Sequence, residues 1–171
     1  MTDLDSHFDA LYQASADPWS VTTAWYERRK RATLMAALPR ERYRHALELG
    51  CGNGATTRLL AERCDAVRAV DSSPAAVARC AHAVAAGGFT NVQLDVCRLP
   101  DTWPLQQGEP VDLIVVSELA YYFTDADLDR LLSRCRQALA QDGDWLMCHY
   151  TRPFHDRLQD TARIHDKINN L

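Results

Sequence analysis

A-L-E-L-G-C-G-N-G-A-T-T, residues 46–57, begins as the short apolar run of a buried strand. It continues through three alternate glycines, Gly50, Gly52 and Gly54, and then enters a predicted helix over Ala55–Arg63. Glycine lets the backbone turn tightly and approach a ligand because it has no Cβ. The amides at the start of the helix face the same crevice. Strand, glycine turn and helix together predict the opening of a nucleotide-binding βαβ unit.

The charge of Glu48 helps to decide which of two kinds of nucleotide cofactor this loop holds. Gly50-x-Gly52-x-x-Ala55 also matches the relaxed dinucleotide pattern, which leaves a nicotinamide or flavin cofactor open. A carboxylate at the end of the strand repels a pyrophosphate and attracts a cofactor that carries an ammonium or a sulfonium. The charge of Glu48 therefore favours the cationic cofactor. Cys51 is interpreted as a small side chain that fits the loop.

The composition is that of an ordinary globular domain, with 171 residues, 47% of them hydrophobic and 25% charged. Folding should bury roughly two-thirds of the unfolded surface, enough for one core, so we expect a single domain. The net charge of −4 gives no nucleic-acid signal. No run approaches the ~18 apolar residues of a membrane span. The acidic N-terminus lacks the features of a secretory signal, and we expect a cytoplasmic protein.

The cysteines predict neither a disulfide framework nor a metal site. Six are present, and no two form a C-x-x-C pair. Such a spread is typical of small buried residues in a reducing compartment.

The N-terminal segment predicts two helices. Residues 1–18 indicate a short amphipathic helix with Phe8, Leu11 and Tyr12 on one side, followed by the loop 16–19. A second helix runs to about Leu38, capped by one of two threonines and ended by a proline. The residues concerned are Thr22 and Thr23 for the cap, Pro39 for the end, and Trp25, Ala32, Met35 and Leu38 for the apolar side.

The second helix carries a basic run, 28–31, that has two interpretations. The first is a solvated helix face. The second is that one or two arginines, Arg28 among them, close over a carboxylate of the cofactor or an anionic part of the acceptor. Trp19, Trp25 and Tyr26 lie beside this run, just upstream of the glycine loop, and keep the second interpretation open.

A second strand, Ala66–Asp71, ends in an acid 17 positions after Gly54. This spacing is close to that at which a carboxylate accepts from both hydroxyls of a ribose. Asp71-Ser72-Ser73-Pro74 also makes a good helix cap, and both interpretations hold if Ser72 or Ser73 is the cap. The following helix is predicted over Pro74–Ala86 and stops at two glycines.

A third strand, Val92 to Asp95 or Val96, ends in an acid as well. Asp95 can accept from an adenine amino group, while the Val96 amide reaches a ring nitrogen. The alternative is an ordinary loop aspartate. Residues 99–110 contain three prolines and predict a surface connection.

The most apolar run, Val111–Ser117, predicts a buried parallel strand that leads into S-E-L-A-Y-Y-F, residues 117–123. A helix from Asp125 to about Ala140 follows, ended by Gly143, and Asp144–Tyr150 makes a fifth strand. At most one helix, from about Asp156, is expected in the polar remainder.

Strands that alternate with helices predict an α/β fold with a doubly wound parallel sheet of order 3-2-1-4-5. The order reverses between strands 1 and 4, where ligands bind in such sheets. The glycine loop and the segment 117–122 should therefore face each other across one crevice.

With these segments together, the chain resembles the class I S-adenosylmethionine-dependent methyltransferases, and within them the NodS-type nodulation N-methyltransferases. The matching pieces are D-P-W at 17–19, W-Y-E-R at 25–28, L-E-L-G-C-G-N-G-A-T-T, the strand ending at Asp71, and D-L-I-V-V-S-E-L-A-Y-Y-F at 112–123. The resemblance covers residues 17–149. It implies a Rossmann-like fold, S-adenosylmethionine as cofactor with S-adenosylhomocysteine as product, and transfer of a methyl group to a small-molecule amine such as an amino sugar.

The resemblance also sets expectations for the organisation of the chain. We expect a helical cap over 1–40, a cofactor-binding core over 41–150 and a C-terminal tail over 151–171. The family's sheet ends with an antiparallel hairpin of strands 6 and 7, whereas only about twenty residues follow the fifth strand here, and Arg157–Leu171 indicate helix or loop. We therefore expect either a truncated chain or a sheet without that edge, and a partner chain that completes the sheet is an alternative.

The expected cofactor residues are Glu48, Gly50, Cys51, Gly52, Gly54, Asp71, Ser72, Asp95, Val96, Ser117 and Arg28. Glu118 follows strand 4 directly and is the first choice to bind or deprotonate an amine acceptor. Tyr121 and Tyr122 can orient the acceptor or offer a ring face to its cation. His149 is the second choice of base. The alternatives are that Glu118 caps a helix or pairs with an arginine, that one tyrosine belongs to the core, and that the domain binds cofactor without turnover.

Overall fold

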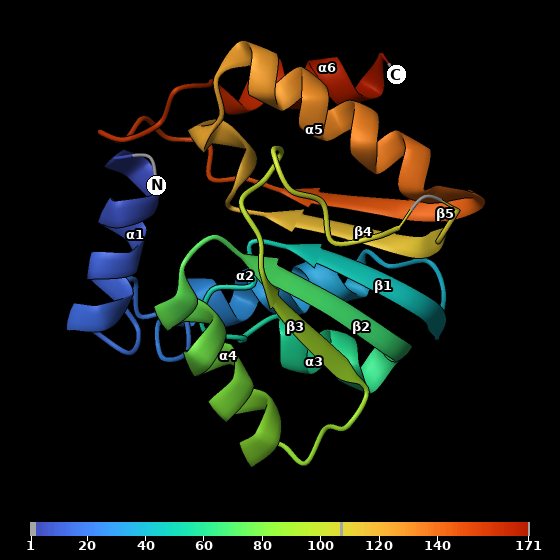
Figure 1. Cartoon of the computed structure of the whole chain (residues 1–171), viewed down its shortest axis with the longest axis horizontal. Coiled ribbons are helices and arrows are strands. Elements are labelled where there is room, and N and C mark those ends of the chain that lie inside the picture. Colours follow the sequence, from blue (N-terminus) through green and yellow to red (C-terminus); the bar gives the residue numbers. More distant parts are fainter. Residues whose placement is uncertain (1–2, 107, 171) are drawn as a thin grey trace.

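The computed structural model describes residues 3–106 and 108–170, and a parallel sheet forms its centre (Figure 1). Its strands are β1 (Tyr43–Leu49), β2 (Cys64–Asp71), β3 (Val92–Val96), β4 (Val111–Ser117) and β5 (Leu139–Cys148). Neighbouring strands are hydrogen-bonded in the order β3-β2-β1-β4-β5, and every pair is parallel. The predicted α/β fold and strand order are confirmed.

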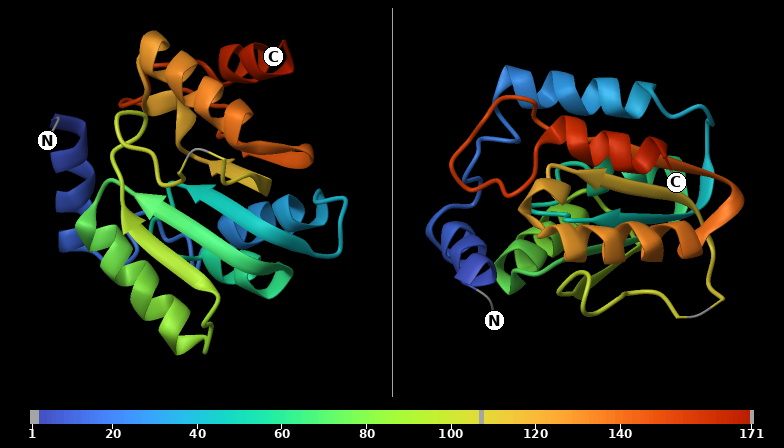
Figure 2. Two further views of the ribbon diagram at one scale, coloured as in Figure 1. Left: turned by 45° about the vertical axis from the view of Figure 1, so that its right-hand side comes forward. Right: turned by 90° about the horizontal axis from the view of Figure 1, so that it is seen from above.

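Helices cover both faces of the sheet, as the two further views show (Figure 2). The helices are α1 (Asp3–Ala14), α2 (Trp25–Ala36), α3 (Thr57–Arg63), α4 (Pro74–Ala86), α5 (Asp125–Ala138) and α6 (Thr161–Asn169), with a short 3-10 turn at η1 (Ala120–Tyr122). The predicted first helix included Met1 and Thr2, which lie outside the described residues. None of the helices in the described ranges has the length and apolar character needed to cross a membrane.

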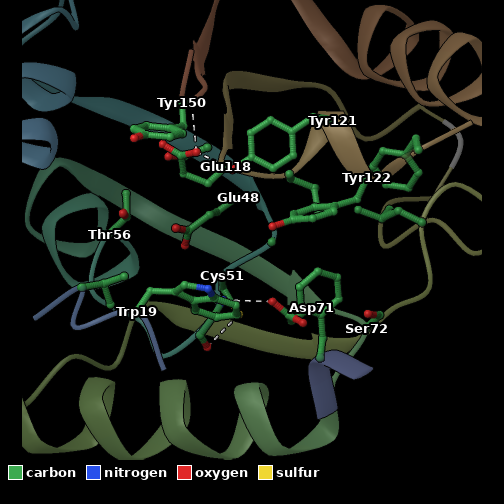
Figure 3. Close-up of a pocket in the computed structure, with 18 of the residues that line it drawn as sticks. Trp19, Glu48, Cys51, Thr56, Asp71, Ser72, Glu118, Tyr121, Tyr122 and Tyr150 are labelled. Carbon is green, nitrogen blue, oxygen red and sulfur yellow. Dashed lines mark hydrogen bonds between the residues drawn. The ribbon is translucent and has the colours of Figure 1, made fainter. Parts of the chain in front are cut away.

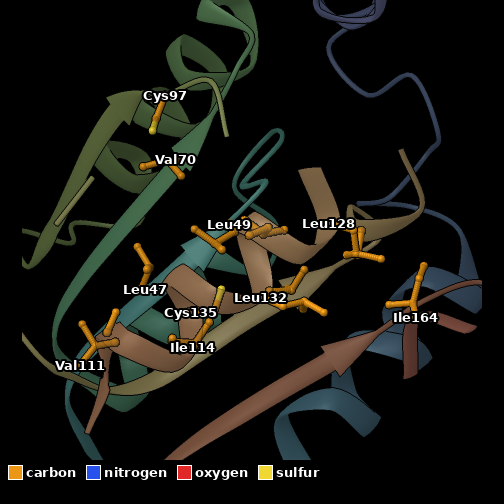
Figure 4. Packing of buried hydrophobic residues seen from close by; sticks show 14 of the residues in the cluster. Leu47, Leu49, Val70, Cys97, Val111, Ile114, Leu128, Leu132, Cys135 and Ile164 are labelled. Carbon is orange, nitrogen blue, oxygen red and sulfur yellow. The ribbon is translucent and has the colours of Figure 1, made fainter. Parts of the chain in front are cut away.

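Two apolar clusters hold the layers together. The first joins one face of the sheet to α5 and to Ile164 of α6, and Leu128, Leu132 and Cys135 of α5 point into it (Figure 4). The second joins the opposite face to α2, α3 and α4. β4 contributes to both clusters and is buried over Val111–Val116, as the unbroken apolar run predicts.

The sheet reverses where the sequence predicts it. β1 pairs with β2 on one side and with β4 on the other, so that the connections from β1 and β4 leave in opposite directions. The carboxyl ends of the strands point toward α1 and toward the segment that follows β5 (Figure 1). A crevice at these ends therefore has the glycine loop on one side and residues 117–123 on the other.

The predicted inner face of the second helix is confirmed only in part: Leu38 is buried and Met35 packs against the core, whereas Trp25 and Ala32 are exposed. The predicted N-cap is wrong. α2 is preceded by Ala24, which makes no side-chain cap, and it buries Leu34, while Trp25 is 68% exposed. Thr22 and Thr23 precede the helix in a turn that Asp17 holds through the backbone amides of Val21 and Thr22. The first turn of α2 thus projects beyond the sheet, and only its later turns pack on the core.

The predicted start of the fifth strand is also wrong. β5 begins at Leu139, which pairs with Val111, and its pairing then jumps to Asp144 opposite Leu113. Gly143 lies within this irregularity instead of ending the preceding helix. Residues 140–143 lie between the two paired parts and have no partner in this ladder. The sequence pattern therefore does not indicate that the strand begins at Leu139. α6 begins at Thr161, later than predicted, and Arg163 and Lys167 bind Asp125 and Asp129 of α5.

Candidate active site

A cavity of about 870 Å³ opens at the carboxyl ends of the strands. Its walls include Glu48, Gly50, Cys51, Gly52, Asp71, Ser72, Ser117, Glu118, Tyr121 and Tyr122, all of which the sequence predicts as site residues. Figure 3 shows several of them around a common space. Five predicted site residues do not line it: Gly54, Asp95, Val96, Arg28 and His149. A cavity of this size suits a small organic ligand.

The glycine loop is held against β2 by its own backbone. The amides of Gly50 and Cys51 both donate to the Val70 carbonyl at 2.9 Å. Gly52 has a φ of +53°, and a Cβ at this position would lie 2.6 Å from the Tyr12 hydroxyl. A side chain at position 52 would thus clash with the Tyr12 hydroxyl, which packs directly on the loop.

Gly54 serves packing, in contrast to its predicted role in cofactor binding. Its φ is +84°, and a Cβ there would lie 2.9 Å from the Cys80 Sγ and 3.1 Å from the Cys80 Cα. The missing side chain lets the turn before α3 approach α4. This turn moves the first helical residue from the predicted Ala55 to Thr57.

Glu48 lies under the loop and is almost fully buried, with 3% of its surface exposed. The Thr57 hydroxyl donates to Oε2 at 2.5 Å. Burial raises the pKa of the Glu48 carboxyl well above its usual range, and the Thr57 hydrogen bond lowers it only in part. A cationic group in the crevice would favour the charged form of Glu48, whereas a phosphate would oppose it.

Asp71 binds the glycine loop at the end of β2. Oδ2 accepts from the Gly52 amide at 3.0 Å, and Oδ1 accepts from the Ser73 amide at 3.0 Å. Ser73 caps α4 by accepting from the Ala76 amide, so the cap is Ser73 and not Ser72, which lines the cavity. The carboxylate therefore has a fixed position at the cavity wall.

The residues that line the cavity at the end of β3 come later in the chain than predicted. Asp95 forms an ion pair with Arg68 at 3.8 Å, and Val96 is 55% exposed. The Cys97 amide donates to the Asp71 carbonyl at 2.9 Å, which turns the chain toward the crevice. Cys97 and Arg98 line the cavity in place of the two predicted residues.

Glu118 is the most constrained side chain on the opposite wall. It directly follows β4 with a φ of +56°, a region that non-glycine residues rarely adopt. Its Oε1 lies 2.9 Å from the Lys30 Nζ, while Oε2 accepts from the Tyr121 hydroxyl and, at 3.0 Å, from the Tyr150 amide. The neighbouring Tyr150 and Tyr121 are labelled with it in Figure 3. Three donors thus hold one carboxylate at the cavity.

The two tyrosines differ in their surroundings. Tyr121 is buried, with 4% of its surface exposed, and its hydroxyl is committed to Glu118. Tyr122 is half-buried, and its ring meets Phe8 of α1 edge to face at 4.8 Å between centroids. Burial raises the pKa of Tyr122 to about 12, and the nearby Asp156 and Glu118 add to this. Both phenols are therefore neutral hydrogen-bonding groups at neutral pH.

His149 does not reach the cavity, so its predicted role as a base is wrong. Its Nε2 accepts from the Ala120 amide at 3.1 Å, and Nδ1 lies 3.2 Å from the His165 Nε2. Burial lowers the pKa of His149 to about 4. The ring instead supports the turn η1 that carries Tyr121 and Tyr122.

Arg28 does not lie at the crevice either. Its guanidinium donates to the Thr23 carbonyl at the start of α2, and the side chain is exposed. Lys30 and Arg31, two and three positions later, line the cavity. Arg28 and Arg29 are therefore exposed, as the first interpretation predicts, while the next two residues face the crevice. Whether they bind a carboxylate there stays a prediction.

Aromatic residues of the N-terminal segment form a wall that the sequence predicted only in part. Tyr12 and Phe8 of α1 and Trp19 line the cavity, with the Tyr12 and Trp19 rings 5.5 Å apart. Asp17 accepts from Asn53 of the glycine loop at 3.3 Å. The sequence signals for this wall were the apolar side of the first helix, with Phe8 and Tyr12, and the motif D-P-W at 17–19.

The sequence model of the family described as "Methyltransferase domain" matches residues 46–143, more than half of the chain. The chain belongs to this family, and its strand order and glycine loop are those of the class I S-adenosylmethionine-dependent methyltransferases.

Within the family the chain is NodS-like. It is 33% identical over 110 residues to Nodulation protein S of Bradyrhizobium diazoefficiens, which covers 64% of this chain and 50% of that protein. It spans about half the length of the curated relatives it matches.

Two crystal structures share the fold. A Pseudomonas syringae protein named as a methyltransferase is 41% identical, with a TM-score of 0.70 and 86% of each chain covered. The N-methyltransferase NodS of Bradyrhizobium japonicum WM9, solved with S-adenosyl-L-homocysteine, is 24% identical, with a TM-score of 0.77 and coverage of 85% of this chain and 72% of that one.

Proposed function

We propose that this chain binds S-adenosylmethionine over its glycine loop and transfers the methyl group to a small-molecule amine. The observation that carries the proposal is the pair of carboxylates, Glu48 under the loop and Asp71 beside it, at one end of the cavity. Among proteins of this fold, an acid under the loop suits a cationic adenosyl compound and opposes a diphosphate, and an acid at the end of the second strand suits a ribose diol.

The residues present fit this cofactor. Gly52 lines the cavity without a side chain, and Asp71 is fixed where it can accept from a ribose diol. Lys30 and Arg31 are the cations that face the crevice from α2, and Arg31 is the better placed for a carboxylate because Lys30 already binds two acids. S-adenosylmethionine, when bound, supplies a methyl group on a sulfonium as the electrophile.

The acceptor is proposed to be an amine because of the wall around Glu118. The relatives with the name N-methyltransferase act on nitrogen, and the wall here combines a carboxylate with tyrosine rings, which suits an ammonium or amine. A carboxylate has about four lone-pair positions. Lys30, Tyr121 and Tyr150 use three of them. The remaining position on Oε1 is proposed to accept an N–H of the acceptor.

In this proposal Glu118 binds and orients the amine, and its three protein donors keep it in place. An amine must lose its proton before it attacks, and a fixed carboxylate next to the nitrogen can receive that proton. Tyr122 closes the wall without being charged. Orientation of this kind can contribute on the order of 7–11 kcal/mol to a displacement.

Turnover of amino-sugar acceptors, measured beside their hydroxyl analogues, tests the proposal. We expect methylation of the amine, and Glu118→Gln should leave affinity for S-adenosylhomocysteine within about twofold while reducing turnover at least about tenfold. Methylation of the hydroxyl analogue instead would contradict the amine acceptor. Tight binding of S-adenosylhomocysteine without methylation of any acceptor would indicate a binding module.

A further inference from the structure

The end of β5 and the two residues after it hold the segment that carries the proposed acceptor wall. The Cys148 carbonyl accepts from the Glu118 amide at 2.8 Å, and the Tyr150 amide donates to Oε2 of Glu118 at 3.0 Å. Between these two contacts, Nε2 of His149 accepts from the Ala120 amide at 3.1 Å. Of the three contacts, that of His149 uses a side chain on the β5 side, so it depends on the residue type.

The Ala120 amide needs this acceptor. Ala120 opens the turn η1 and is fully buried. The first amides of a helical turn have no acceptor within the turn, and a buried amide without an acceptor is destabilising. The ring of His149 supplies the acceptor from outside the turn. The position at which η1 begins is therefore fixed by this ring.

His165 of α6 determines which nitrogen of His149 carries the proton. Burial lowers the pKa of His149 to about 4, so the ring is neutral at neutral pH. A ring nitrogen that accepts a hydrogen bond has no proton, and the proton of His149 is therefore on Nδ1. It is donated to Nε2 of His165, 3.2 Å away. Because this second hydrogen bond selects the tautomer, α6 keeps Nε2 of His149 available to the Ala120 amide.

Tyr121 connects this turn to Glu118. Its hydroxyl donates to Oε2 of Glu118, and its ring meets the His149 ring edge to face at 5.3 Å between centroids. Its carbonyl accepts from the amides of Leu158 and Gln159 at 2.7 and 3.1 Å. Tyr121 is thus held from two sides, and a displacement of η1 takes its hydroxyl away from the carboxylate.

We propose that His149 and His165 are positioning residues for Glu118 in the binding of the acceptor. They act through η1, which keeps the Tyr121 hydroxyl on Oε2 and leaves the remaining position of Oε1 to the amine. The inference rests on the proposed function, because the amine belongs to it. The chain of hydrogen bonds from α6 to Glu118 consists of protein groups alone, so it can be tested separately.

Calorimetric binding of glucosamine to the chain saturated with S-adenosylhomocysteine tests the positioning. His149→Leu removes the acceptor of the Ala120 amide, and we expect it to weaken glucosamine binding at least about tenfold. His149→Gln can place an amide oxygen near the position of Nε2, and we expect an affinity within about threefold of wild type. Both variants should bind S-adenosylhomocysteine as wild type does, because the glycine loop is not part of this chain of hydrogen bonds.

Three outcomes of this titration would overturn the proposal. The first is equal weakening of glucosamine binding in His149→Leu and His149→Gln. The second is wild-type affinity for glucosamine in His149→Leu. The third is a loss of S-adenosylhomocysteine binding in His149→Leu, which would show that the residue supports the whole fold and not the acceptor wall.

His165 supplies a second pair of variants, because it is only half-buried and its replacement leaves the apolar core intact. His165→Leu should weaken glucosamine binding, whereas His165→Gln keeps an acceptor for Nδ1 of His149 and should not. Arg163→Leu is the control on the same helix, since Arg163 binds Asp125 at 2.7 Å and is exposed. Equal weakening in Arg163→Leu and His165→Leu would mean that loosening of α6 is the cause, and the proposal would fail.

NMR of the imidazole nitrogens tests the chain of hydrogen bonds without an acceptor. We expect the proton of His149 on Nδ1 in wild type and in Arg163→Leu, and on both nitrogens in part in His165→Leu. A proton on Nε2 in wild type would overturn the proposal. If wild type binds no glucosamine, the proposed amino-sugar acceptor fails. The positioning role then stands if the Ala120 amide exchanges faster in His165→Leu than in His165→Gln, and it falls if the two rates are equal.

Discussion

The Lys30 Nζ lies 2.9 Å from Oε1 of Glu118, which joins α2 to the carboxyl end of β4 across 88 positions of sequence. The same ammonium binds Glu27 at 2.8 Å, and both partners of the main pair are largely buried. Burial alone would lower the pKa of Lys30, but the two carboxylates outweigh it and raise the pKa. Lys30 is thus a permanent cation that orients Glu118 in the wall of the cavity.

Lys30→Met should destabilise the chain and disturb the acceptor wall, because Glu118 loses its counterion while it stays partly buried. We expect a loss of about 1–3 kcal/mol in the free energy of unfolding, measured by urea denaturation. Arg29→Met is the matched control, since its cation is exposed and lies over the Trp25 ring. Equal losses of unfolding free energy in the two variants would show that the Lys30–Glu118 ion pair stabilises the chain no more than an exposed cation does.

Asp71→Asn should weaken the binding of S-adenosylhomocysteine by at least about tenfold, or about 1.4 kcal/mol. The amide retains one acceptor oxygen for the neighbouring backbone but loses the charge and the second acceptor. Asp95→Asn, at the end of the adjacent strand and outside the cavity, is the control and should bind as wild type does. Unchanged affinity in Asp71→Asn, measured by calorimetry, would remove this residue from the cofactor site.

Gly54→Ala should destabilise the chain more than Gly88→Ala. Both glycines have positive φ, +84° and +72°, which costs an alanine about 1–2 kcal/mol. At Gly54 the new Cβ also meets Cys80 at 2.9 Å, whereas nothing lies within 4 Å at Gly88. Overpacking adds about 1–3 kcal/mol. Chemical denaturation of the two variants measures the difference, and equal values would refute the close approach of the loop to α4.

Stability should fall in acid because of His149. Its pKa is about 4 when folded and about 6.5 when unfolded. Between these values the unfolded chain binds a proton that the folded chain does not, so the contribution is complete above pH ~6.5 and is lost as the pH falls toward ~4. The effect is on the order of 3 kcal/mol.

Free energies of unfolding at several pH values measure this contribution. His149→Gln should flatten the dependence within that window, whereas His82→Gln, at an exposed position of α4, should not. The same slope in wild type and His149→Gln would contradict the assignment.

The features that depend on short stretches of sequence could be predicted. The apolar run of β4 and the alternate glycines after β1 each act through neighbouring residues, and together they define the sheet order and the crevice. The interrupted pairing of β5 could not be predicted, because the partner strand decides where Leu139 joins the ladder. We propose, from the sequence, the division into a cap over 1–40, a core over 41–150 and a tail over 151–171.

The candidate site was predicted less completely than the fold. Glu48 and Asp71 follow from their place at strand ends, but Asp95 does not, since the chain turns toward the crevice two residues later, at Cys97. Lys30 carries no local signal that separates it from Arg28, because only the packing of α2 decides which side of the helix meets Glu118. Long-range contacts of this kind need the assembled structure.

We propose that the glycine loop, with Glu48 beneath it and Asp71 beside it, holds a sulfur-containing adenosyl compound and not a diphosphate. Calorimetric titration of the reduced wild-type chain with S-adenosylhomocysteine, and in parallel with NAD, tests it most directly. We predict saturable binding of one S-adenosylhomocysteine per chain and no binding of NAD. Saturable binding of NAD, or no heat with the adenosyl compound, would contradict it.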